Sequence, residues 1–208
     1  MKIEVENLTK QLGGRAVLCE VNCQFEGGVI YGIVGHNGSG KTMLMRAIAG
    51  LIRPTAGRVV ADGSVVGKDI SFPKEMGLLI EKPEFLGYLS GLDNLKLLAE
   101  IRGIVSEEEI RRYMSMFALD ADSRQKARKY SLGMKQKLGI IQALMEAPRL
   151  LILDEPFNAL DQDSVEILRG LLLQYKKEGR LIILTSHHPE DIKSVCDVTI
   201  RLEEGRRV

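Results

Sequence analysis

The sequence has few of the features that mark metal-scaffold, secreted or membrane-spanning proteins. Its three cysteines, Cys19, Cys23 and Cys196, have neither zinc-site spacing nor a paired framework, so we expect reduced thiols. No apolar run approaches the length that crosses a bilayer, since even Leu150–Leu153 ends at two carboxylates. The first residues alternate charged with apolar side chains and do not resemble a secretory signal. These absences predict a cytoplasmic protein.

The sequence also lacks a charge imbalance and any repetition. Among 208 residues, 29 Lys and Arg against 28 Asp and Glu give a formal net charge of +1. This balance gives no electrostatic argument for binding nucleic acid, and none is expected as a partner. No internal repeat, low-complexity tract or linker divides the chain. We therefore expect residues 1–208 to form a single domain.

A glycine-rich segment after the apolar run at 29–34 is the most informative stretch of the chain. It reads Gly35-His36-Asn37-Gly38-Ser39-Gly40-Lys41-Thr42, and Met43 then continues a helical pattern. Three glycines let the backbone turn tightly and aim N–H groups at a polyphosphate, while the following helix adds its positive end. In such a P-loop, Lys41 reaches the β and γ phosphates and the Thr42 hydroxyl binds Mg²⁺. The alternative is a glycine-rich connecting turn, which the complete spacing disfavours.

The order of hydrophobic patterns around this segment predicts the fold. Alternation over 2–8 and 16–25 predicts an antiparallel β layer. From about 88 to 147 helical patterns replace strands. They include a stripe of Leu92, Leu95, Leu98 and Ile101 and a capping box at 106–109, and strands return at 150–154 and 181–185. We predict an α/β P-loop NTPase core with a mainly parallel sheet, an N-terminal antiparallel β subdomain and an inserted helical subdomain at about 88–147.

Two carboxylates at the end of a buried strand indicate the reaction. Leu150–Leu153 is aliphatic throughout and is followed by Asp154 and Glu155. Asp154 is the candidate residue beside Mg²⁺, and Glu155 is the candidate general base that takes a proton from the attacking water. The alternative, that both acids only cap the next turn, is weaker beside a P-loop. The pair favours nucleotide hydrolysis over simple binding.

Four further segments resemble the nucleotide-binding subunit of an ATP-binding cassette (ABC) transporter over nearly the whole chain. They are the signature-like Tyr130-Ser131-Leu132-Gly133-Met134, the D-loop-like Asn158-Ala159-Leu160-Asp161, the switch-histidine segment Thr185-Ser186-His187, and Glu81 at the Q-loop position. The resemblance implies that Ser131 and Gly133 contact the nucleotide of a second copy, that Asp161 helps link the two sites, and that His187 hydrogen-bonds the γ-phosphate or the attacking water. Glu81 would approach Mg²⁺.

The same resemblance implies the partners. Two ATPase subunits, identical or different, would bury two ATP molecules between them, and closure would drive a separate membrane permease. The subunit would then lie on the inner face of the cell membrane. A docking surface for the permease is expected around 78–87, where Phe85 either contacts the permease or fills the core. The changed signature and Q-loop look most like the bacitracin and lantibiotic-immunity branch, which implies export.

One further departure concerns the base. Leu12 stands where the family places an aromatic side chain on adenine, so we predict a weak adenine contact and modest ATP affinity. The alternative functions are a soluble ABC ATPase acting on a ribosome or DNA, a P-loop kinase or GTPase, and a non-hydrolysing transporter subunit. No tandem cassette, coiled-coil insertion or guanine-reading motif supports the first two, and the intact Lys41, Asp154 and Glu155 argue against the third.

Overall fold

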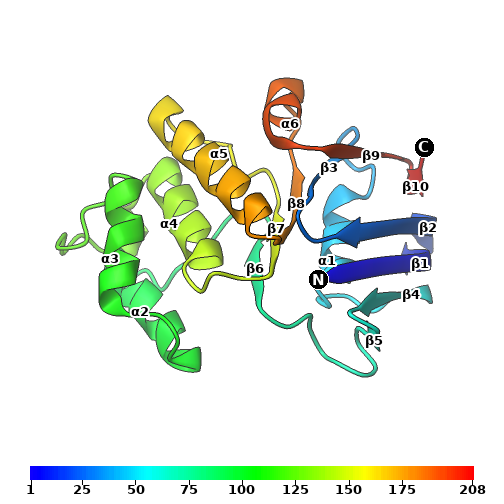
Figure 1. Ribbon diagram of the computed structural model, residues 1–208, viewed down its shortest axis with the longest axis horizontal. Helices are drawn as coiled ribbons and strands as arrows, with labels where there is room; N and C mark the ends of the chain where they lie inside the picture. The colour runs from blue at the N-terminus through cyan, green and yellow to red at the C-terminus, as the bar shows by residue number, and fades with distance from the viewer.

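The computed structural model describes residues 1–208 and contains a parallel and an antiparallel sheet with helices on both faces of the parallel one (Figure 1). The larger sheet has the order β10 (Arg206–Arg207), β9 (Val198–Glu203), β3 (Ile30–Val34), β8 (Leu181–Thr185), β7 (Leu150–Leu153), β6 (Met76–Leu79). All of its strand pairs are parallel except β10 with β9. The smaller sheet is antiparallel, with the order β2 (Arg15–Glu26), β1 (Lys2–Leu12), β4 (Ala56–Ala61), β5 (Ser64–Val65).

The helices connect and cover these strands. They are α1 (Lys41–Ile48), α2 (Gly91–Arg102), α3 (Glu107–Met116), α4 (Leu132–Leu144), α5 (Gln162–Lys177) and α6 (Pro189–Val195), with a short 3₁₀ turn at Ala127–Lys129. Helices α2, α3 and α4 lie between β6 and β7 in the chain and form the left-hand part of Figure 1. None of the helices combines the length and the apolarity needed to span a bilayer.

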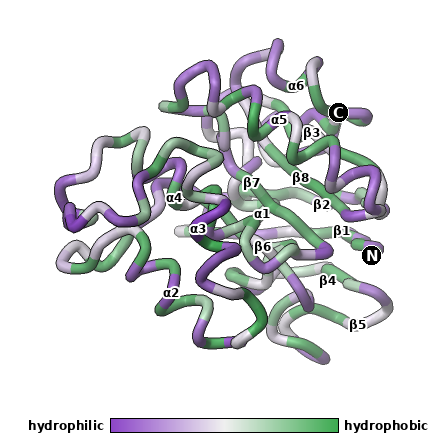
Figure 2. Tube along the Cα trace, turned by 60° about the vertical axis from the view of Figure 1, so that its left-hand side comes forward, coloured by the Kyte–Doolittle hydropathy of each residue, from purple (hydrophilic) through white to green (hydrophobic).

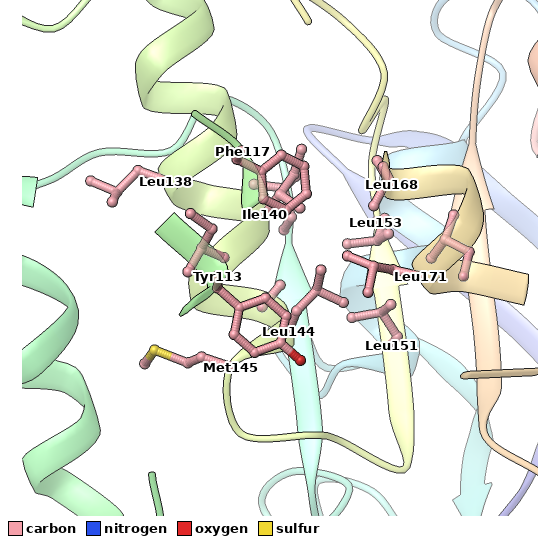
Figure 3. Close-up of a cluster of buried hydrophobic side chains, with 14 of the residues drawn as sticks. Tyr113, Phe117, Leu138, Ile140, Leu144, Met145, Leu151, Leu153, Leu168 and Leu171 are labelled. Carbon is pink, nitrogen blue, oxygen red and sulfur yellow. The ribbon is translucent and has the colours of Figure 1, made fainter. Parts of the chain in front are cut away.

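The parallel sheet separates two hydrophobic cores. Strands β7 and β8 are buried along their whole length and run through the interior in hydrophobic colours (Figure 2). Their side chains alternate: Leu151 and Leu153 pack toward α4 and α5 (Figure 3), while Leu150 and Ile152 pack toward α1 and the antiparallel sheet. Uninterrupted apolar strands are typical of a parallel sheet covered on both faces. The helices of 91–144 therefore share a core with the sheet.

Two local expectations were wrong. The Ser106 hydroxyl accepts from the Glu109 N–H, but the Glu109 carboxylate pairs with Arg112, so the reciprocal half of the capping box is not formed there. The complete box lies at Ser90 and Asp93. Ile101, expected in the buried stripe of α2, is 77% exposed, because it lies in the last turn of that helix, which ends at Arg102.

Parallel order places three strand ends at one edge of the sheet. β8 lies between β3 and β7, and the chain leaves these three strands at Gly35, Asp154 and Ser186. Residues directly beyond the carboxyl ends of parallel strands share a crevice, which is the usual ligand site of such sheets. The P-loop, both acidic residues and the histidine segment are therefore neighbours.

Candidate active site

The P-loop joins β3 to α1 and is shaped by its backbone. Gly40 has φ of 104°, and a Cβ there would lie 2.8 Å from the carbonyl oxygen of Val17, so the position admits no larger residue without a shift. Lys41 Nζ donates to the carbonyl of Gly35 at 2.8 Å and to that of His36 at 3.2 Å, which places the ammonium within the loop. The result is a concave backbone with a fixed positive charge, suited to a polyphosphate.

Ser39 completes the interior of this loop. The residue is fully buried and its Oγ has no hydrogen-bond partner within the protein. Buried hydroxyls are ordinarily satisfied, so the loop contains a polar atom for which a phosphate oxygen would be an acceptor. His36, Asn37 and Gly38, in contrast, lie exposed at the surface of the loop.

A chain of hydrogen bonds runs from the P-loop through the acidic pair. The Thr42 hydroxyl donates to one carboxylate oxygen of Asp154 at 2.8 Å, and the Thr185 hydroxyl donates to the other at 2.6 Å. Thr185 in turn accepts from the Glu155 N–H at 2.9 Å. Asp154 thus lies against the P-loop, as the sequence predicted. The sequence named Thr185 only as the start of the switch-histidine segment and did not predict these bonds, although it is the one polar residue of a fully buried strand.

The donor set at this point fits a magnesium ion. Thr42 Oγ1 and Asp154 Oδ2 are 2.8 Å apart and are oxygen ligands of the kind that Mg²⁺ prefers. No group of three or more His, Cys, Asp or Glu gathers in the chain to form a full protein cage. This arrangement suits an ion that keeps several waters and takes its other ligands from substrate phosphates. Thr42 and Asp154 would hold it, and the ion would neutralise charge on the phosphates.

Glu155 and His187 form a second pair directly beside the first. His187 Nδ1 lies 2.8 Å from Glu155 Oε2, and the His187 N–H donates to the same oxygen at 3.2 Å. Glu155 has φ of +50°, a backbone conformation that non-glycine residues seldom adopt. With Nδ1 protonated, the ring donates to the carboxylate and fixes its orientation, which suits a general base. The sequence predicted His187 near a phosphate or water; the structure ties it to Glu155.

Glu81 forms no hydrogen bond or ion pair with these groups. Its carboxylate pairs with Arg46 of α1 at 2.7 Å and its side chain is 59% exposed. It does share with Asp154 and Glu155 a cavity of about 350 Å³. The structure therefore pairs Glu81 with a cation near the site, and its role as a magnesium ligand stays a prediction.

The signature-like and D-loop-like segments lie at helix starts. Ser131 is exposed and caps α4, its hydroxyl accepting from the Met134 N–H at 3.2 Å. Asp161 caps α5 and forms an ion pair with Lys137 at 2.5 Å; this ion pair and the Ser164 amide hold the pKa of Asp161 well below its ordinary value. Neither Ser131 nor Gly133 makes a hydrogen bond to the P-loop of its own chain.

The remaining predicted positions lie at the periphery of the site. Leu12 ends β1 and is 45% exposed, so it is available to a ligand. Phe85 packs partly buried against the core that contains α4, which favours the core reading over the docking one. Leu86 beside it is 40% exposed.

Comparison with known proteins shows what this chain is similar to. A protein-family model described as ABC transporter matches residues 18–158. The uncharacterised ABC transporter ATP-binding protein YybJ of Bacillus subtilis (strain 168) is 48% identical over 204 residues, covering 98% of this chain and 94% of YybJ. The bacitracin transport ATP-binding protein BcrA of Enterococcus faecalis is 39% identical over 208 residues, covering 99% of this chain and 68% of BcrA.

The fold itself is also known from solved structures. The dimeric structure of a post-hydrolysis state of the ATP-binding cassette MJ0796, bound to ADP and Pi, matches with a TM-score of 0.84 and 23% identity, covering 99% of this chain and 96% of that one. This likeness shows the fold. The family model, which covers more than half of the residues, and the two relatives above identify the chain as a member of the ABC transporter family, an ATPase that is the ATP-binding subunit of such a transporter.

Proposed function

We propose that this subunit hydrolyses Mg²⁺-bound ATP at the edge formed by the P-loop, Asp154, Glu155 and His187. The observation that carries the proposal is the continuous hydrogen-bonded chain from Thr42 through Asp154 and Thr185 to Glu155. Lys41 binds the β and γ phosphates, and Glu155, oriented by His187, accepts a proton from the attacking water. Water oxygen bonds to the γ-phosphorus as the bond to the ADP oxygen breaks, giving ADP and phosphate.

The proposal extends to a second copy of the subunit. Ser131 and the first backbone amides of α4 form a helix N-terminus of the kind that binds anions. Ser131 makes no hydrogen bond to the P-loop of its own chain. A head-to-tail pair brings each such terminus to the nucleotide of the other subunit. MJ0796, of the same fold, is dimeric in its solved structure. ATP binding would close the pair, and hydrolysis would weaken it by removing the γ-phosphate contact.

The work of this cycle would be export through a separate membrane permease. BcrA, at 39% identity, is named a bacitracin transport ATP-binding protein, which supports transport of a compound of that kind. The subunit would dock to the permease on the cytoplasmic face of the membrane. A polytopic protein encoded by the adjacent reading frame, co-purifying with this subunit at fixed stoichiometry, supports this part; an adjacent frame without one favours the soluble ABC ATPase instead.

Substitution of Glu155 by Gln tests the chemistry. We expect ATP turnover to fall by a factor on the order of 100 or more, with ATP still bound, because the amide cannot take a proton. Size-exclusion chromatography should then show an ATP-dependent dimer. The matched control, Glu178→Gln at the end of α5, should hydrolyse ATP normally. Unchanged turnover in Glu155→Gln would remove Glu155 from the chemistry.

A crosslink tests the geometry of the pair. Asn37 in the P-loop and Ser131 at the start of α4 are both exposed, so cysteines at these positions are accessible. We expect Asn37→Cys combined with Ser131→Cys to crosslink between chains when ATP is added, in the Glu155→Gln background. The Asn37→Cys and Ile104→Cys pair, with the second cysteine on the helical subdomain, serves as the control. Equal crosslinking with and without ATP would refute the head-to-tail arrangement.

A further inference from the structure

One face of α4 grips the segment that runs from Glu155 to Asp161. The face is formed by Gly133, Gln136 and Lys137, whose spacing of three and four residues places them on the same side of a helix. The gripped segment starts directly beyond β7 and contains the D-loop-like residues 158–161. We call these three residues the α4 grip.

Gln136 makes the contact nearest to the hydrolytic group. It is buried, and its Nε2 donates to the carbonyl oxygens of Glu155 and Pro156, each at 3.2 Å. Both acceptors are backbone groups, so the contact fixes the path of the chain at Glu155. A buried amide whose donors are used in this way specifies the conformation of what it binds.

Lys137 and Gly133 hold the other end. The Lys137 side chain is 11% exposed and its ammonium pairs with Asp161 at 2.5 Å. A Cβ on Gly133 would lie 2.7 Å from the carbonyl oxygen of Ala159, so the two backbones touch. The α4 grip thus contacts the segment at its beginning, its middle and its end.

The gripped segment has an unfavourable backbone that needs such support. Glu155 and Ala159 have φ of +50° and +59°, values that residues with a Cβ adopt at a cost. Such residues persist where the surrounding structure over-determines them, and they are concentrated at functional sites. A further support at Glu155 is the bond from its N–H to Thr185. The carboxylate beside His187 is therefore held from the β8 side and from α4.

We propose that Gln136 and Lys137 are positioning residues, which keep the Glu155 carboxylate in its hydrolytic orientation against His187. This inference rests on the proposed role of Glu155. Ser131, at the start of the same helix, is about 7.5 Å along the axis from Gln136 at a rise of about 1.5 Å per residue. A displacement of α4 by the partner's nucleotide would therefore also move the support of this chain's own general base. One helix would couple the two ATP sites.

The main test separates turnover from binding. Gln136→Leu keeps a similar volume but removes both donated bonds. We expect kcat for ATP to fall about tenfold with the Kd for ATP nearly unchanged, and the melting temperature to fall by roughly 2–4 °C, because two backbone carbonyls lose their donor. The matched control is Gln142→Leu on the same helix, since Gln142 makes no hydrogen bond to the gripped segment; its kcat should equal that of the wild type. A lower ATP affinity with unchanged kcat would overturn the proposal.

The ion pair gives an independent test in case Gln136→Leu does not fold. Lys137→Met should lower kcat several-fold, and Lys137→Arg, which keeps the charge for Asp161, should restore it. Equal kcat in the wild type, Lys137→Met and Lys137→Arg would show that the ion pair does not position Glu155.

A double variant shows whether the α4 grip acts through Glu155. In the Glu155→Gln background, Gln136→Leu should leave the residual single-turnover rate unchanged within a factor of two, because the group that it positions is gone. A further tenfold loss in that background would overturn the proposal. Normal turnover in Glu155→Gln refutes the proposed function itself, whereas normal turnover in Gln136→Leu with an inactive Glu155→Gln refutes only this inference.

Discussion

The P-loop and the start of α4 both present a helix N-terminus at the protein surface, but they are built differently. The P-loop is fixed by backbone: the Gly205 N–H donates to the Ser39 carbonyl at 3.0 Å, and the Cys19 N–H donates to the Gly205 carbonyl at 2.8 Å. The α4 region is fixed by side chains, through Ser131, Gln136 and Lys137. The first design tolerates few glycine replacements; the second depends on individual polar groups.

The difference separates affinity from turnover. A backbone cradle determines how well phosphates are bound, and the side chains around Glu155 determine how fast the bound nucleotide is cleaved. We therefore expect substitutions on the P-loop side to change mainly ATP affinity and those on the α4 side to change mainly kcat. The following experiments test this contrast, beginning with the largest effect.

Replacing Lys41 by Ala should strongly weaken ATP binding by the P-loop. It removes the charge that contacts the β and γ phosphates and the two bonds to the carbonyls of Gly35 and His36. We expect the affinity for ATP to fall by roughly 10-fold to 150-fold, because a hydrogen bond to a charged group is worth about 1.5–3 kcal/mol. Equilibrium binding of labelled ATP should fall together with turnover. Lys68→Ala, exposed and remote from the loop, is the control, and retained ATP affinity in Lys41→Ala would contradict the prediction.

Replacing Gly205 by Ala should destabilise the P-loop, because Gly205 is hydrogen-bonded to the Ser39 carbonyl. Gly205 has φ of +76° and a Cβ there would lie 2.6 Å from the Val17 carbonyl oxygen. We expect a loss of about 1–3 kcal/mol in the free energy of unfolding and a several-fold higher Kd for ATP. Gly63→Ala is the matched control, because φ is +85° with no atom within 4 Å of the added carbon. Denaturant unfolding and ATP titration of both variants measure the difference. Equal ATP affinities of the two variants would show that Gly205 does not support the P-loop.

Substitution of Tyr113 tests the packing around α4 without changing a residue of the nucleotide site. Its hydroxyl lies 2.8 Å from that of Tyr175, which donates to the Leu144 carbonyl, so the pair joins α3, α4 and α5 inside the core. Tyr113→Phe should cost about 1 kcal/mol of unfolding free energy, the usual value of one buried hydrogen bond. ATP affinity should not change. Tyr88→Phe, at a position 66% exposed with no hydrogen bond, should cost nothing measurable.

Substitution of Leu12 should give the smallest effect, and it tests the contribution of the adenine contact to ATP affinity. Leu12→Phe adds an aromatic face at the expected adenine position and should tighten ATP binding by about 1 kcal/mol, or roughly fivefold, with kcat unchanged. Isothermal titration measures the gain. Ile104→Phe, an exposed position on the helical subdomain, controls for added surface hydrophobicity. An unchanged Kd in Leu12→Phe would show that Leu12 does not contact the base.

The parts of the site that the sequence predicts are those formed by residues that follow one another in the chain. The P-loop spacing, the aliphatic run before Asp154 and the strand at 181–185 are local patterns, and parallel order then brings them together. The bonds from Gln136 and Thr185 were not predicted, because each joins residues about 20 to 30 positions apart and depends on how the elements pack.

The wrong capping box has a similar cause. Glu109 has the spacing to reach back to Ser106, but Arg112 lies one turn ahead and offers a bidentate ion pair. A sequence motif names a potential partner, and the competing partner decides the geometry. Asp93, with no such competitor bonded to it, closes the reciprocal box at Ser90.

The alternation of side chains along β7 has a consequence for evolution of this chain. Leu150 and Ile152 belong to one core, Leu151 and Leu153 to the other, and Asp154 follows at the sheet edge. Deleting one residue of β7 would exchange the two sets and pull Asp154 back into the sheet. Aliphatic substitutions in this strand are tolerable, whereas a change of its length by one residue is not. We therefore expect related chains to differ in which aliphatic residues form this strand but not in the number of residues.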